Sequence, residues 1–301
     1  MNRRLFIRNS LLAGGALALG PRMYANGLNF ADWKIHPIRK DVYLFTERGG
    51  SIVFLRNKTG TVVVDSQFPE QAGHLIGELK KTAPVPFDLL INTHHHGDHS
   101  GGNIAFKGQV KQVLAHINSK INQENQAKAQ QSEDKQLYPD LTFSDKWCVD
   151  FGKEKICAHY FGPGHTNGDA LIHFENANIV HMGDLLANKR YPYIDRGAGA
   201  SMENWMLILD RAQNVFDRKT LFVCGHGRDA NDVIVNRDYL REMKFFFESI
   251  FDHVKKEIVA GKTKEQIIAT PAIPMMESWV DPNSFVKPLL ETAYHELTIP
   301  A

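Results

Sequence analysis

Residues 87–103 read FDLLINTHHHGDHSGGN, and this stretch decides the fold. Its first part, FDLLI, is almost entirely apolar, which is typical of a strand buried on both faces of a sheet. Side chains that bind metals follow at once in HHHGDH. If the chain stays extended, His94 and His96 point the same way, and the next glycine permits a sharp turn that carries Asp98 and His99 toward a second position. The sequence therefore predicts a buried strand that ends in a loop able to serve two adjacent metal sites.

Further polar side chains come shortly after other apolar runs. Asp65, Asp184 and His226 each follow a stretch with the composition of a buried strand. Because the ends of neighbouring strands meet along one edge of a sheet, where binding sites commonly lie, we expect these side chains to join the histidine loop. Imidazole and carboxylate together suit zinc, manganese or iron. A surface histidine tract that binds metal loosely is the alternative, but the buried strand before the loop disfavours it.

The rest of the chain alternates between strand-like and helix-like segments. Strands are predicted at residues 42–45, 51–55, 61–64, 113–115 and 221–224 and, with tight turns, between 147 and 182. Helices are predicted at residues 69–81, 118–131 and 201–215. After residue 231 we expect a long helix to about residue 260, a short one that begins after residue 263 and a last one near residues 284–297. Strands followed by helices, twice over, indicate two sheets packed together with helices outside. We expect one domain over residues 26–301, with a helical tail from about residue 231.

Residues 1–25 differ in character from the rest. They combine a basic start, a short apolar stretch at residues 11–19 and small residues that end at Ala25. The apolar stretch is too short to span a bilayer comfortably, so we interpret the segment as a cleaved signal peptide. The pair Arg3-Arg4 is similar to that of twin-arginine signals, which export folded proteins. This predicts a periplasmic or otherwise exported protein without a stable membrane anchor after cleavage; an ordinary secretory signal or a retained anchor are the alternatives.

Composition excludes several other classes of protein. The chain has 301 residues, of which 43% are hydrophobic, and a formal net charge of +1, so no basic excess points to nucleic acid. Of the three cysteines, Cys148 and Cys157 could face each other across a hairpin and form a disulfide in an oxidising compartment. The interpretation that we favour is that all three are small buried apolar residues. The sequence does not predict the oligomeric state.

The segment at residues 93–103 resembles the HxHxDH motif of the metallo-β-lactamase superfamily. Four further elements follow the order of that family: Asp65 at the end of a strand, GPGHT at residues 162–166, GD at 183–184 and GHG at 225–227. The pattern spans residues 42–227. The resemblance implies an α/β fold, a four-layer αββα sandwich of two mixed β-sheets flanked by helices, here with a helical C-terminal extension.

The resemblance also implies a set of seven ligands for two divalent metal ions, most simply zinc, with iron or manganese as alternatives. One ion is held by His94, His96 and His165, the other by Asp98, His99 and His226, and Asp184 bridges both. Asp98 is in addition the expected catalytic group, which orients the attacking water or passes a proton to the leaving group. Asp65 is expected outside the ligands, where it accepts hydrogen bonds that fix the histidine loop. His95 alternates away from its neighbours and receives no ligand role, and His173 and His181 are expected to be satisfied core histidines.

The substrate is less well defined by these features. The chain has both His99 and Asp184. In this it is more similar to glyoxalase II, lactonases and related esterases than to those zinc β-lactamases that carry cysteine at the position of Asp184. In the polar and aromatic segment at residues 185–201, we expect Asn188, Lys189 and Tyr191 to line the substrate groove, with Lys189 or Arg190 binding a substrate carboxylate. A solvated loop over packed tyrosines is the alternative for this segment.

These observations lead to one leading hypothesis about function. The chain is predicted to be an exported dinuclear hydrolase that uses a metal-bridging hydroxide to cleave an ester, lactone or amide bond, including that of a β-lactam, in a small molecule. Two alternatives remain open. One is a mononuclear iron sulfur dioxygenase, and the other is a periplasmic metal-binding accessory protein without turnover.

Overall fold

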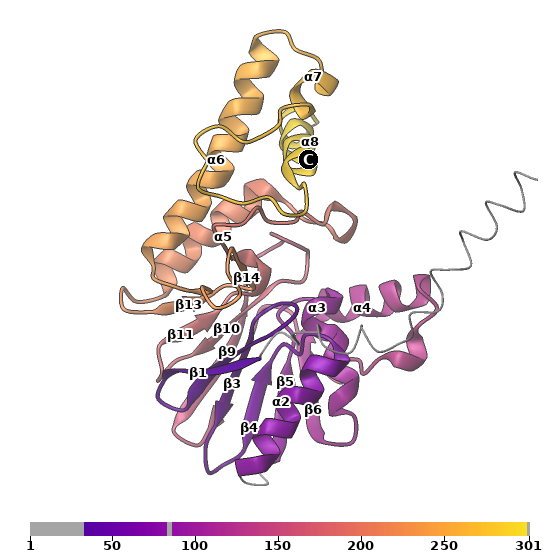
Figure 1. The fold of residues 1–301 in the computed structure, drawn as a ribbon, viewed down its shortest axis with the longest axis vertical. Helices are drawn as coiled ribbons and strands as arrows, with labels where there is room; N and C mark the ends of the chain where they lie inside the picture. The colour runs from indigo at the N-terminus through magenta and orange to yellow at the C-terminus, as the bar shows by residue number, and fades with distance from the viewer. Residues whose placement is uncertain (1–32, 83–85, 300–301) are drawn as a thin grey trace, which may run out of the picture. The chain divides into compact units, whose positions relative to one another are not determined.

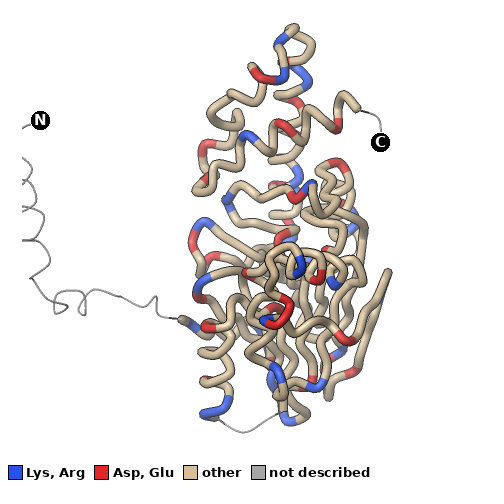
Figure 2. Tube along the Cα trace, turned by 90° about the vertical axis from the view of Figure 1, so that its right-hand side faces the viewer, with Lys and Arg blue, Asp and Glu red and all other residues tan. Residues whose placement is uncertain are grey.

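The computed structural model describes residues 33–82 and 86–299, so the predicted signal peptide lies outside the described residues. The described residues form two mixed β-sheets flanked by helices, which confirms the predicted fold class (Figure 1). Lys and Arg are interspersed with Asp and Glu along the chain in the view of Figure 2. Among the described helices, none combines the length and the apolar character needed to cross a bilayer.

The first sheet contains seven strands, and their spatial order is their order in the chain. The strands are β1 (Lys34–Arg39), β2 (Val42–Thr46), β3 (Ile52–Arg56), β4 (Thr61–Val64), β5 (Phe87–Ile91), β6 (Val110–His116) and β7 (Leu141–Phe143). The pairs from β1 to β4 are antiparallel, and those from β4 to β7 are parallel. Strand β1 was not predicted because it is polar and contains Pro37, which is tolerated at the edge of a sheet.

The second sheet has the order β15-β13-β11-β10-β9-β8. Its strands are β8 (Lys146–Phe151), β9 (Glu154–Tyr160), β10 (Ala170–Phe174), β11 (Ile179–His181), β13 (Leu221–Val223) and β15 (Ile234–Val235). Strands β11 and β13 are parallel, so the segments that follow them leave the sheet at the same edge. A small ladder between β12 (Ala187–Asn188) and β14 (His226–Gly227) joins those two segments beyond the sheet.

The helices begin close to the predicted positions. They are α2 (Pro69–Thr82), α3 (Gly97–Ser100), α4 (Ile117–Ala129), α5 (Met202–Val215), α6 (Asp238–Val259), α7 (Lys264–Ile268) and α8 (Val286–Thr298). The side chain of Ser201 accepts a hydrogen bond from Asn204 N and so caps α5 as expected. The long helix α6 is the exception and starts later than predicted, because strand β15 lies between Asn231 and the start of the helix. Helices α5, α6 and α8 pack together in the part of the molecule that Figure 1 colours from salmon to yellow.

One apolar core lies between the two sheets. Buried side chains from the first sheet, such as Val53 and Leu55, belong to the same cluster as Ile156 and Ile172 from the second. Each fully buried side chain of this kind contributes about 1.5–3 kcal/mol to folding. The backbone also ties the sheets together at their shared edge, where Ser51 N donates to the carbonyl oxygen of Gly225 at 2.8 Å. The loops that carry the predicted ligands therefore start from a rigid base.

The cysteines differ from the interpretation that we favoured. Cys148 and Cys157 are directly opposite each other in the β8–β9 hairpin and form a disulfide, and the side chain of Cys148 is exposed rather than buried. The turn at Gly152, which has a φ of +65°, sets this register. Only Cys224 is the buried, free thiol that we expected of all three.

Candidate metal centre

The histidine loop is fixed where it leaves β5. Asp65, at the end of the neighbouring strand β4, accepts hydrogen bonds from the backbone and the hydroxyl of Thr93, both at 2.8 Å. The backbone N–H groups of His99 and Ser100 then donate to the carbonyl oxygen of His96 at 2.9 Å, which closes the single turn of α3. This turn separates His94 and His96 from the pair Asp98 and His99. It directs the two pairs to neighbouring positions.

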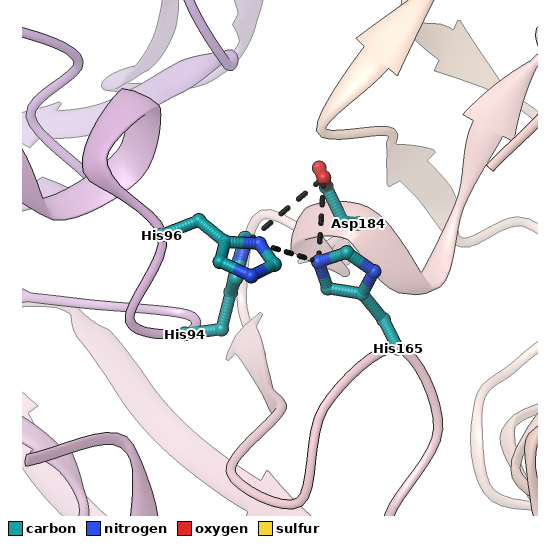
Figure 3. A group of neighbouring side chains, drawn as sticks. All are labelled: His94, His96, His165 and Asp184. Carbon is teal, nitrogen blue, oxygen red and sulfur yellow. Dashed lines mark hydrogen bonds and ion pairs between the residues drawn. The ribbon is translucent and has the colours of Figure 1, made fainter. Parts of the chain in front are cut away.

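Three histidines and one aspartate form the first candidate metal site (Figure 3). His94, His96, His165 and Asp184 each direct one ligand atom into a group whose members all lie within 4.8 Å of one another. His165 Nε2 lies 2.9 Å from His96 Nδ1 and 3.6 Å from Asp184 Oδ2, and His94 Nε2 lies 4.0 Å from that same oxygen. The side chains come from the loops after β5, β9 and β11, as the sequence predicts.

A second candidate site adjoins the first. His226 Nε2 lies 3.0 Å from Asp98 Oδ2 and 3.4 Å from His99 Nε2. The other carboxylate oxygen of Asp184, Oδ1, lies 3.1 Å from His99 Nε2 and 3.4 Å from His226 Nε2. The two oxygens of Asp184 thus face different clusters, which is the geometry of a bridging carboxylate. The structure brings all seven predicted ligand side chains together.

The donor set fits divalent cations. His165 Nδ1 donates to the carbonyl oxygen of Tyr193 at 2.9 Å, so its Nε2 carries a lone pair that faces Nδ1 of His96. His94 Nε2 is buried and has no hydrogen-bond partner. A buried polar atom without a partner costs about 1–3 kcal/mol, which a bound cation would offset. Imidazole nitrogens and carboxylate oxygens in this number suit zinc, iron or manganese.

The electrostatics of the two clusters favour positive charge between them. Burial lowers the pKa of His94 well below its usual value and that of His165 to about 4, so both histidines are neutral near pH 7, the form that binds metals. Burial alone would raise the pKa of Asp98, but His99 and His226 lower it to about 2. The carboxylates of Asp184, Asp98 and Asp65 overcome the effect of burial and raise the pKa of His99. The same negative potential attracts a divalent cation.

Asp65 lies outside the ligands, in the position that the sequence predicts. It is fully buried and its Oδ2 lies 2.8 Å from His99 Nδ1 and 3.3 Å from His181 Nε2. His181 was expected to be a satisfied core histidine; it is buried, and its ring also approaches the carbonyl oxygens of Ser51 and Val223 at 3.2 Å. This histidine therefore links the second sheet to the aspartate that fixes the histidine loop.

Two further carboxylates support the centre and were missed by the sequence analysis. Asp169 accepts hydrogen bonds from the backbone of Thr166 at 2.8 Å and its hydroxyl at 2.6 Å, and so holds the loop of His165; burial raises its pKa to about 7. Asp195 lies 2.8 Å from His96 Nε2 and 3.6 Å from His95 Nε2; burial opposes the hydrogen bond from His96, which lowers the pKa of Asp195 to about 2. The Thr166-to-Asp169 spacing is a local signal that could have revealed the first, whereas nothing local marks the second.

Close packing around the ligands explains two glycines. A Cβ atom at Gly225 would lie 2.0 Å from Asp184 Oδ1, and one at Gly50 would lie 2.1 Å from the ring of His99. Neither position accepts a larger residue without moving a ligand. The sequence analysis included the first of these glycines in the GHG element and missed the second.

The residues predicted to contact substrate are only partly in place. The side chain of Asn188 is buried and donates to the carbonyl oxygen of Asp232, and Lys189 pairs with Glu242 and lies 5.7 Å from the centre of the Trp279 ring. The prediction of these two as groove residues is wrong, because partners distant in sequence draw both side chains away. Tyr191 does line the groove, but it is buried and its hydroxyl accepts a hydrogen bond from Ile273 N.

A cavity of about 340 Å³ opens beside both clusters. Asp98, Asp184 and His226 form its floor, and its walls contain Arg190, Tyr191, Pro192, Tyr193, Asn283 and Phe285. A second cavity of about 220 Å³ shares His226 and Arg190 with the first and adds Arg228. In the described part of the chain, the guanidinium of Arg190 makes no ion pair with an acidic side chain.

Fold and site together define a class: two-sheet αββα proteins with a histidine- and aspartate-rich metal centre at the common edge of the sheets. The sequence pattern of the Metallo-beta-lactamase superfamily matches residues 45–227, and the chain belongs to this superfamily. The match ends before α6, so the part of the cavity wall that Asn283 and Phe285 provide lies outside it.

Several individual proteins are similar to the chain. The 2,4-dinitroanisole O-demethylase subunit alpha of a Nocardioides species is 28% identical over 154 residues, and the hydroxyacylglutathione hydrolase of Pelagibacter ubique is 27% identical over 146 residues. These matches cover 50% and 47% of this chain but only 45% and 52% of the relatives. A metallo-beta-lactamase type 2 of a Bacillus species is 26% identical over 205 residues, 64% of this chain and 76% of the relative.

Two solved structures share the fold. A metallo-beta-lactamase from Pontibacter korlensis superposes with a TM-score of 0.59 at 20% identity and covers 71% of this chain and 98% of its own. A double mutant of the sec-alkyl sulfatase PisA1 superposes with a TM-score of 0.67 at 13% identity and covers 88% of this chain and 50% of its own.

Proposed function

We propose that this protein is a hydrolase that uses two divalent metal ions to cleave an ester, lactone or amide bond in a small molecule. The observation that carries the proposal is the position of Asp184, whose two oxygens face separate clusters of ligand atoms. His94, His96 and His165 would hold one ion, and Asp98, His99 and His226 the other. Bound metal ions of this kind acidify water at neutral pH and stabilise the negative charge that develops on the substrate oxygen.

The residues of the chain have distinct tasks in this reaction. Asp98 is partly exposed at the floor of the cavity, where its carboxylate is positioned to accept a proton from the attacking water and return it to the leaving group. The rings of Tyr193 and Phe285, whose centres are 5.4 Å apart, form an apolar wall that excludes water from one side of the substrate. Arg190 offers an unpaired positive charge at a distance from the clusters, which suits a substrate that carries a carboxylate.

The names of the relatives support hydrolysis without naming the substrate. One relative is named for hydrolysis of an acylglutathione and others as β-lactamases, while a further one is an O-demethylase subunit. We include β-lactams and lactones among the candidate substrates. We also propose export through a twin-arginine signal in residues 1–25, with which the disulfide between Cys148 and Cys157 agrees, because such bonds persist in oxidising compartments.

The test combines metal analysis with a substrate panel. Protein lacking residues 1–25 is purified, its metal content is measured, and it is assayed on aryl esters, lactones, thioesters and β-lactams after loading with zinc, manganese or iron. We expect about two metal ions per chain and turnover of at least one ester-like or amide-like class. One iron per chain with oxygen uptake on a persulfide, or metal binding without turnover of any class, would contradict the proposal.

A further inference from the structure

We infer that Asp195 is a positioning residue of the metal centre: its carboxylate holds His96 in the tautomer and orientation that present Nδ1 to the first metal site. The inference rests on metal binding as proposed above. The decisive contact is between His96 Nε2 and Asp195 Oδ2, at 2.8 Å. Because an ionised carboxylate only accepts hydrogen bonds, His96 carries its proton on Nε2 and leaves a lone pair on Nδ1.

The lone pair on His96 Nδ1 points toward the other ligands. It lies 2.9 Å from His165 Nε2, which also carries a lone pair because His165 Nδ1 donates to a backbone carbonyl. Two lone pairs at this distance repel each other unless a cation or a proton lies between them. The hydrogen bond to Asp195 therefore fixes an arrangement that is favourable with a metal ion bound and unfavourable without one. Carboxylates that hold a metal-binding histidine in this way also raise its basicity.

The backbone around Asp195 makes its carboxylate a rigid support. Its Oδ1 accepts a hydrogen bond from Ala198 N at 3.0 Å, which caps a short 3-10 helix, Arg196–Ala198. Its own N–H donates to the carbonyl oxygen of His165 at 3.2 Å. The carbonyl oxygen of Tyr193, two residues earlier, orients His165. The short segment at residues 193–198 thus orients two of the three histidines of the first site.

The second site is supported in the same way by a different residue. His99 donates through Nδ1 to Asp65 at 2.8 Å, and this leaves its Nε2 for the metal. Asp65 ends a central strand, whereas Asp195 lies in a loop and its side chain is 17% exposed. Each metal site therefore has its own supporting carboxylate, which makes the effect of removing one of them specific to one ion.

The experiment measures zinc affinity and histidine tautomers rather than turnover. Full-length mature protein and the variants Asp195→Ala, Asp195→Asn and Asp252→Asn are titrated with zinc against a chromogenic chelator. Asp252 is exposed on α6 and serves as the matched control. We expect Asp195→Ala to weaken the binding of one zinc ion by roughly 10- to 100-fold and to leave the other within about twofold. Asp195→Asn retains an oxygen acceptor and should recover part of the loss.

A second measurement keeps the inference falsifiable if the alanine variant folds poorly. In metal-free protein labelled with nitrogen-15, the ring of His96 should give the signature of a proton on Nε2, and Asp195→Ala should shift it toward a mixture of tautomers. The inference would be overturned if Asp195→Ala bound both zinc ions as tightly as the unsubstituted protein and the tautomer of His96 were unchanged. If the unsubstituted protein binds neither zinc nor manganese nor iron, the proposed function fails instead, whereas the tautomer of His96 in the metal-free protein still tests the inference, so the two failures are distinguishable.

Discussion

The two halves of the metal centre are built from similar ligands but are held by different parts of the fold. The half that contains His99 is supported by Asp65, which is completely buried between the sheets and contacts Thr93, His99 and His181. The half that contains His96 is supported by Asp195, which lies in a loop whose Tyr193 lines the cavity. The sheets therefore position the second candidate metal site directly, while the first depends on a loop that also lines the cavity through Tyr193.

Replacement of Asp184, the carboxylate that the two halves share, should have the largest effect on metal binding and hydrolysis. Asp184→Ala deletes the carboxylate that faces both clusters, so we expect loss of at least one metal ion and a fall in hydrolysis rate of roughly 10³-fold, because bound metal supplies several kcal/mol of charge stabilisation. Metal analysis and initial rates on the best substrate of the panel test this. Retention of both ions with near-normal turnover would mean that the two clusters do not form one centre.

Replacing Asp65, which is fully buried, should destabilise the fold more than replacing Asp195, which is partly buried. Asp65→Ala leaves Nδ1 of His99 buried without its acceptor, and loss of a buried charged partner costs about 3–5 kcal/mol. Asp195→Ala should cost less, about 1–3 kcal/mol, because its side chain is only partly buried and water can replace part of the lost contact. Urea unfolding of the metal-free proteins measures both values. Equal losses of stability in the two variants would contradict the expectation that the support from the sheet matters more for folding than the support from the loop.

Asp169, which holds the loop of His165, should make the stability of the fold depend on pH. Burial raises the pKa of Asp169 to about 7 in the folded protein, against 3.8 as its ordinary value. The folded state then binds this proton more tightly than the unfolded state, so the stability that Asp169 contributes is present below about pH 4 and decreases as the pH rises toward 7. Asp169→Asn should remove this slope. Chemical unfolding of both metal-free proteins at pH 4.5 and 7.5 tests it, and parallel pH profiles would count against the raised pKa.

The proposal that Arg190 binds a substrate carboxylate can be tested with two esters that differ only in that carboxylate. Arg190→Gln should raise KM for mono-4-nitrophenyl succinate by roughly 10- to 100-fold, the value of a charged hydrogen bond. KM for 4-nitrophenyl butanoate, which has a methyl group in place of the carboxylate, should hardly change. Arg218→Gln, which removes an exposed charge elsewhere, is the control. Equal effects on both esters would show that Arg190 does not select for the anion.

Replacement of Phe285, a residue of the cavity wall outside the region that matches the family, should have the smallest effect. Phe285→Ala removes the ring that packs on Tyr193, so KM for aryl esters should rise about three- to tenfold with little change in kcat, because binding of apolar area is lost equally in ground and transition states. Steady-state kinetics separate the two constants. A selective fall in kcat would instead assign the ring a role in the reaction itself.

The sequence predicted the parts of the centre that depend on local pattern. Apolar strands followed at once by polar side chains identified the ligand loops, because strand ends meet at one sheet edge. The same reasoning failed for Lys189, whose partner Glu242 lies on a helix more than fifty residues later. It also failed for Asp195, which is 99 residues from the histidine that it supports. Such contacts depend on how a polar loop folds back, and composition alone does not distinguish a supporting carboxylate from a solvated one.

The position of Tyr193 has a consequence for how the protein responds to its ligands. Its ring is 41% exposed and lines the cavity, while its carbonyl oxygen accepts the hydrogen bond that orients His165. A molecule in the cavity that moves the backbone of Tyr193 together with its ring would also move the carbonyl oxygen that orients His165. Occupancy of the cavity and affinity for a metal ion at the first candidate site would then be thermodynamically linked, and each would alter the other by the same factor.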